Sequence, residues 1–236
     1  MIELIEDYWL YFLIGQFPDG PLGGLVLTLL LGVSALLLAL PLGVLLGLAR
    51  ASRIRALSWP VGALVYLVRG TPLLMVIFWA YFFLPALTGH DTSQFATMLA
   101  ALAVFNGAYL AEIVRAGIQG IPRGQTECAR ALGLNYWQTM RAVVLPQALR
   151  NMLPSVIGQL VTTLKETSLG YIIGLSEVSF IASQVNAQVI TRPAEVYAIL
   201  ALTYFVLCFG LSRIGRALES RLSQHSSGSR VEVQGA

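Results

Sequence analysis

Four consecutive residues with charged or hydroxyl side chains interrupt a long apolar run in the second half of the chain. They are Lys165, Glu166, Thr167 and Ser168. Charges within apolar runs of this length are costly and usually mark a pathway for a ligand or an ion. Together the four side chains could match the carboxylate and the ammonium group of one small ligand. The structural alternative is an ion pair between Lys165 and Glu166, although adjacent residues point about 100° apart on a helix.

Two further charged residues lie within apolar runs and join this candidate pathway. Arg69 comes three residues before Pro72, which removes a backbone donor, so its guanidinium could contact a ligand or pair with the freed carbonyls. Glu112 lies three residues before Arg115, a spacing that favours an ion pair on one helix face. We expect that pair for Glu112, whereas both roles stay open for Arg69.

The sequence contains no arrangement that predicts catalysis or metal binding. Its single lysine, Lys165, does not follow a glycine, so there is no phosphate-binding loop of the G-K-S/T type. Cys128 and Cys208 do not form a plausible disulfide or metal pair, and His90 and His225 fall in different compartments of the topology derived below. We therefore expect no catalytic residue, no metal site and no cofactor bound by this chain.

The composition predicts an all-α integral membrane protein. Of 236 residues, 56% are hydrophobic and 11% are charged, and the mean hydropathy is +0.73. Apolar stretches of about twenty residues recur with charges between them, which is typical of membrane-spanning helices and not of one soluble core.

We predict five transmembrane helices. They cover residues 22–49, 57–84, 95–114, 149–173 and 194–211. The second run is too long for one straight crossing, and Pro72 should break it into a short interfacial or cavity-lining piece followed by the second span. In the first run, Gly43 and Gly47 would allow close contact with another helix, although this spacing is often incidental in a glycine-rich run.

The distribution of arginine predicts the orientation. Most of the 15 Lys and Arg residues follow span one, lie between spans three and four, or follow span five. Residues 1–21 contain four acids and no cation. The N-terminus is therefore predicted to be outside and the C-terminus cytoplasmic. Residues 1–21 read as an interfacial amphipathic segment, and residues 222–236 as a polar, disordered cytoplasmic tail.

A basic, amphipathic loop at residues 123–147 separates spans three and four. A first short helix is predicted through Glu127, Ala129 and Arg130, Gly133 should end it, and a second helix should begin near Asn135. Small, apolar, aromatic and charged side chains together are typical of a docking knob. The alternative is an ordinary surface hairpin that lies on lipid or on the protein's own helices.

The spacing of this loop resembles the EAA loop of bacterial ABC importer permeases. That pattern is Glu-Ala-Ala, three residues, Gly, nine residues, Ile, one residue and Leu-Pro. Here it runs from Glu127 through Gly133 to Val143 and Leu145-Pro146, with Cys128 in place of the second residue and Val143 in place of Ile. Four stretches also resemble the polar amino acid permease branch. They are residues 69–74, 108–118, 145–148 and 165–169.

The resemblance, which covers roughly residues 15–220, implies a permease domain over residues 22–221 of a multi-pass protein in the bacterial inner membrane. It implies a second permease, identical or paralogous, an ATPase dimer that binds ATP and magnesium, an extracytoplasmic amino-acid-binding protein and membrane lipid as partners, and no nucleic acid. It further implies that the loop docks on the ATPase as a coupling helix. The residues assigned to this coupling are Glu127, Ala129, Arg130, Gly133, Leu134, Leu145 and Pro146.

The resemblance implies import of a polar or charged L-amino acid. One alternative is an ABC permease for another small solute, such as methionine, a metal ion or an organic cation. The other is a self-standing secondary carrier or channel, which would usually show coupling-ion carboxylates and repeated halves. No internal repeat is evident in the sequence, and five spans with a docking loop fit half of a transporter better.

Overall fold

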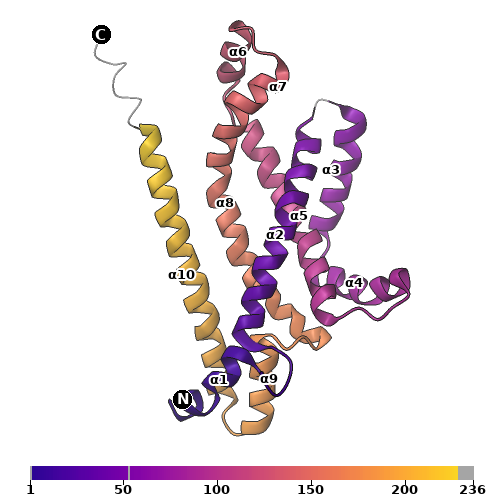
Figure 1. The fold of residues 1–236 in the computed structure, drawn as a ribbon, viewed down its shortest axis with the longest axis vertical. Coiled ribbons are helices and arrows are strands. Elements are labelled where there is room, and N and C mark those ends of the chain that lie inside the picture. The colour runs from indigo at the N-terminus through magenta and orange to yellow at the C-terminus, as the bar shows by residue number, and fades with distance from the viewer. Residues whose placement is uncertain (1, 53, 228–236) are drawn as a thin grey trace.

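The computed structural model describes residues 2–52 and 54–227. The regular elements in these ranges are helices, in agreement with the predicted fold class (Figure 1). In chain order they are α1 (Ile2–Ile14), α2 (Gly24–Ala51), α3 (Arg55–Gly70), α4 (Leu73–Thr88), α5 (Gln94–Gln119), α6 (Arg123–Ala131), α7 (Tyr136–Thr139), the π-helix η1 (Met140–Val144), α8 (Leu145–Glu166), the 3-10 helix η2 (Thr167–Ile173), α9 (Val178–Val189) and α10 (Pro193–Ser227).

Three of the described helices are long and apolar enough to cross a membrane: α2, α5 and residues 193–217 of α10. The pair α3 and α4 meets the same criterion together, bent by 104° at the break after Gly70. Thr71 is extended there because the ring of Pro72 disfavours helical backbone in the preceding residue. The predicted break in the second run is thus confirmed. α8, which contains most of the predicted fourth span, does not meet this criterion.

α2 and α5 form the central packing seam of the protein (Figure 1). A Cβ atom on Gly43 would lie 2.4 Å from Cβ of Leu110, and one on Gly47 would lie 2.6 Å from Cβ of Val114. Both distances are shorter than side-chain carbons tolerate. The absence of side chains at Gly43 and Gly47 therefore lets the two helices approach closely, as the small-residue spacing predicted.

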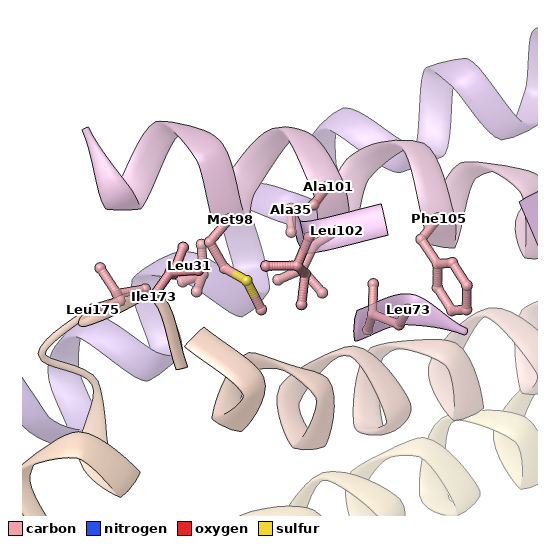
Figure 2. Close-up of a cluster of buried hydrophobic side chains, with 10 residues drawn as sticks. Leu31, Ala35, Leu73, Met98, Ala101, Leu102, Phe105, Ile173 and Leu175 are labelled. Atoms are coloured by element: carbon pink, nitrogen blue, oxygen red, sulfur yellow. The ribbon is translucent and has the colours of Figure 1, made fainter. Parts of the chain in front are cut away.

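A buried cluster joins this seam to α4 and to the end of η2 (Figure 2). Met98, Leu102 and Phe105 on α5 pack with Leu31 on α2 and Leu73 on α4. Leu31, Met98 and Leu102 have no exposed surface. This core fixes the break between α3 and α4 against α5, next to the charged residues of the candidate pathway.

The two ends of the molecule carry different short helices (Figure 1). At one end α1 packs on α9 and α10 through Leu4 and Phe12, while Ile5 and Trp9 remain exposed. This agrees with the predicted amphipathic N-terminal segment. At the other end lie α6, α7 and the last residues of α10.

The prediction for the C-terminal tail needs a correction. α10 extends to Ser227 and so includes residues 222–227, which were predicted to be disordered. No glycine or proline occurs between residues 222 and 227, so nothing there stops the helix. The rest of the predicted tail, residues 228–236, lies outside the described residues.

Candidate functional site: the coupling loop and the charged residues within the helices

The loop between α5 and α8 folds as the two short helices predicted. α6 ends in a Schellman arrangement in which the N–H of Leu134 donates to the carbonyl of Ala129 (3.1 Å) and the N–H of Gly133 donates to that of Arg130 (2.9 Å). Gly133 adopts a φ of 81°, which glycine reaches without strain. Asn135 and Gln138 then form a reciprocal capping box that begins α7. Local sequence signals therefore define both helix ends.

The second short helix does not stop at the end of α7. It continues through one π-helical turn into α8, where the N–H of Leu145 donates to the carbonyl of Met140. Pro146, which follows this turn, has no N–H to donate. The π-helical turn accommodates one extra residue in the helix. Val144 and Ala148 are buried against Val114 and Ile121. The part of the loop after Gly133 is therefore continuous with α8 through η1.

The residues assigned to coupling differ in exposure. Glu127, Arg130 and Pro146 are exposed, Leu134 and Leu145 are half-buried, and Ala129 is buried in the chain itself. Leu132 and Trp137 expose 80% and 77% of their surface. Ala129 thus supports the shape of the loop, while the neighbouring Leu132 and Trp137 present apolar surface. The loop can offer a partner an apolar surface beside the charges of Glu127 and Arg130.

Glu112 is surrounded by three arginines from three helices. Its carboxylate forms ion pairs with Arg50 on α2 and Arg115 on α5, and lies 3.8 Å from the guanidinium of Arg69 on α3. The Arg69 guanidinium also stacks over the ring of Tyr109, 5.0 Å from its centre. The expected pair with Arg115 is confirmed, and Arg69 takes part in pairing. These contacts hold α2, α3 and α5 together.

A second polar cluster joins α5 to α8. The side-chain amide of Asn106 donates to Glu166 (2.9 Å), and its oxygen accepts from Gln159 (2.6 Å) and Thr163 (2.8 Å). Asn106 and Thr163 have no exposed surface. The side chain of Asn106 is fully hydrogen-bonded, because its second donor reaches the carbonyl of Leu102.

Lys165 points away from this cluster. Its side chain lines a groove of about 270 Å³ between α8 and α10, together with Thr162, Ser212 and Arg216. Lys165 is exposed, and within the described residues it forms no salt bridge or side-chain hydrogen bond. The direct pair with Glu166 is absent there, as the helical angle between adjacent residues led us to expect.

The four-residue motif is therefore divided among three environments. Thr167 donates to the carbonyl of Leu164 and Ser168 donates to that of Lys165, both at 2.7 Å. α8 ends at Glu166, so these hydroxyls stabilise the change to a 3-10 helix and do not lie in the middle of a regular span. The structure does not bring the four side chains together around one ligand.

Several polar residues at these positions were not predicted from the sequence. They are Arg50, Asn106, Gln159, Thr163 and Glu177. Asn106 offered a signal, since it is a polar residue in an apolar run. Glu177 has no exposed surface and caps the N-terminus of α9. It accepts hydrogen bonds from the N–H groups of Ser179 and Phe180 and from the hydroxyl of Tyr204. Burial raises the pKa of Glu177 to about 7, against the opposing effect of these donors.

Comparisons with known proteins identify the family. Residues 39–224 match the family described as binding-protein-dependent transport system inner membrane component. The chain is 37% identical over 204 residues to the arginine transport system permease protein ArtQ of Bacillus subtilis, covering 86% of this chain and 93% of that protein. It is 33% identical over 207 residues to the glutamate/aspartate import permease protein GltK of Escherichia coli O157:H7, covering 85% and 92%.

Solved structures agree with this assignment. A crystal structure of an amino acid ABC transporter with histidines matches with a TM-score of 0.78 and 33% identity, covering 84% of this chain and 92% of that one. An inward-facing methionine ABC transporter matches with a TM-score of 0.68 and 24% identity over 84% and 91%, which shows the fold alone. The chain therefore belongs to the family of binding-protein-dependent transport system inner membrane components, as a permease subunit of the amino acid ABC importer type.

Proposed function

We propose that a polar or charged L-amino acid crosses the bacterial cytoplasmic membrane through this permease, driven by ATP and magnesium on a separate ATPase subunit. The relatives described above are named for the transport of arginine and of glutamate or aspartate. The chain itself has no phosphate-binding G-K-S/T sequence. It therefore needs a partner to supply the energy for import.

The proposed topology has five crossings: α2, the bent pair α3 and α4, α5, α8 with η2, and α10. The arginine-rich segments after α2, around α6 and late in α10 lie at one end of the molecule (Figure 1). The positive-inside rule assigns that end to the cytoplasm and α1 and α9 to the outside. The coupling loop then faces the ATPase dimer, and the opposite end faces the substrate-binding protein.

One observation carries the proposed substrate pathway: Lys165 is exposed beside the membrane-spanning part of α10. Ser212, which lies in the apolar segment 193–217, lines the same groove. An exposed ammonium group facing hydrocarbon would be strongly unfavourable, so this side of α8 requires water, a ligand or another protein. We place the translocation pathway there, at the contact with a second permease, and assign Lys165 to the carboxylate of the substrate.

The test is uptake of labelled amino acids by the full importer in vesicles, with ATP supplied on the cytoplasmic side. Lys165→Met should lower uptake about tenfold or more, because it removes a charge-assisted hydrogen bond to the substrate. Expression, binding of the ATPase and basal ATP hydrolysis should persist. Arg192→Met removes an exposed cation between α9 and α10, paired with Glu3 and Glu195 and outside the lining of the groove, and serves as the matched control.

The double variant Lys165→Met with Glu166→Gln separates substrate binding from structural pairing. The two side chains point into different environments, so neutralising both should not restore uptake. Recovery of uptake to near the wild-type rate would show that the two charges serve each other and would contradict the substrate role.

A further inference from the structure

An apolar groove of about 570 Å³ lies between the end of α2, the start of α3 and the coupling loop. Its lining includes Leu45, Leu48, Leu57, Ile118, Trp137 and Met140. Its volume is typical of ligand pockets, which are about 300–1,000 Å³. It is distinct from the groove beside Lys165, which lies between α8 and α10.

The groove continues an apolar surface that crosses the membrane. Leu30, Leu37, Val44 and Leu45 are exposed on one face of α2 and are 41–67% accessible. Apolar side chains that the chain itself leaves uncovered on a spanning helix are available for contact with lipid tails. Since Leu45 and Leu48 belong both to this helix surface and to the groove, a lipid acyl chain can enter the groove sideways from the bilayer.

Two arginines directly follow groove-lining residues in the sequence. Arg55 follows the lining residue Ile54 and Arg141 follows the lining residue Met140. Both arginines are exposed, and neither forms an ion pair within the described residues. Long arginine side chains keep their charge at the membrane surface while their stems cover apolar groups. This combination favours an acyl chain attached to an anionic headgroup.

We propose that this groove binds an anionic phospholipid, with an acyl chain against Leu45, Leu48 and Trp137 and the phosphate beside Arg55 and Arg141. The lipid connects α2 to Trp137 on α7, which is continuous with α8 through η1. Lipid composition then acts on the position of the coupling loop. The proposal relies on the orientation given under the proposed function, which places this end at the anionic cytoplasmic leaflet.

The test uses quenching of Trp137 fluorescence by brominated lipid in the complete complex, reconstituted in phosphatidylcholine vesicles. The difference between wild-type and Trp137→Phe complexes isolates the emission of Trp137. Brominated phosphatidylglycerol, added as a minor component, should quench this emission more strongly than the same fraction of brominated phosphatidylcholine. Trp59, 78% exposed on α3 and not part of the groove lining, is isolated in the same way by Trp59→Phe and should show no such preference.

The arginines provide the second arm. Arg55→Gln with Arg141→Gln should abolish the preference for phosphatidylglycerol, since each cation near the surface contributes about a fivefold preference. Replacing both by lysine should preserve the preference, and Arg213→Gln, on α10, which contributes no residue to the groove lining, should leave it unchanged. Equal quenching of Trp137 by both lipids, or no quenching because a protein partner fills the groove, would overturn the proposal.

Amino acid uptake in the same vesicles separates this inference from the proposed function. Lipid-selective quenching without uptake of any amino acid would support the lipid site and contradict the proposed transport activity. Uptake without lipid-selective quenching would support the proposed transport activity and contradict the lipid site.

Discussion

The seam between α2 and α5 and the seam between α8 and α10 each contain a charged side chain in an apolar environment, but they enclose it differently. At the first, Glu112 is paired with Arg50 and Arg115 and lies close to Arg69. At the second, Lys165 faces an open groove and has no ion pair within the described residues. The same sequence signal, a charge in an apolar run, therefore marks a structural junction in one place and a candidate pathway in the other.

Among the substitutions that test this difference, one at Glu112 should have the largest effect on stability. Glu112→Gln leaves the guanidinium groups of Arg50, Arg69 and Arg115 without their shared counter-charge. Removing one partner of a buried ion pair costs about 3–5 kcal/mol. We expect roughly 2–3 kcal/mol here because the four side chains are 21–38% exposed. Thermal unfolding of the purified permease in detergent measures the loss.

Two variants give the contrast for this measurement. Glu6→Gln removes an exposed carboxylate on α1 and should leave the unfolding temperature unchanged. Lys165→Met should change it little, because Lys165 forms no ion pair or side-chain hydrogen bond within the described residues. Equal destabilisation by Glu112→Gln and Lys165→Met would remove the distinction between the two seams.

Sequence patterns predicted local features of this fold and site because those features depend on neighbouring residues. The break at Pro72, the helix end at Gly133 and the pair of Glu112 with Arg115 all arise within about four residues. The partnership of Arg50 with Glu112 spans 62 positions in the chain and depends on how closely α2 packs against α5. Likewise, only the direction in which α8 faces α5 shows that Glu166 meets Asn106 and that Lys165 does not.

The buried carboxyl group of Glu177 is intermediate between these two cases, because it has hydrogen-bond donors but no ion pair within the described residues. Its pKa is raised from 4.5 to about 7 by burial. The folded state therefore binds a proton more tightly than the unfolded state. The stability that this proton contributes is complete below about pH 4.5 and is lost as the pH rises through about 7.

The variant Glu177→Gln stays neutral at every pH and shows this contribution by difference. Between about pH 5 and about pH 8 the unfolding temperature of the wild type should fall, relative to the variant, by roughly 5 °C. The dependence of this difference on pH should fit the titration of one proton. Parallel curves for the two proteins would show that Glu177 remains ionised in the folded state and that its donors outweigh its burial.

Substitution of Arg69 should have the smallest effect on stability. It also tests whether Arg69 belongs to the ion pairs of Glu112 or to the substrate pathway. Its guanidinium is 3.8 Å from Glu112, its side chain is 38% exposed, and Glu112 keeps Arg50 and Arg115 when Arg69 is removed. Arg69→Gln should therefore lower stability by roughly 0.5–1 kcal/mol, the combined value of a weak ion pair and a partly exposed contact with Tyr109. If ion pairing is the whole role of Arg69, the KM for amino acid uptake by Arg69→Gln should stay within about twofold of the wild-type value. No substrate contact is then lost, and such a contact contributes about tenfold. A tenfold rise in KM at unchanged stability, restored by Arg69→Lys, would assign Arg69 to the substrate pathway and would show that the two seams share one cavity.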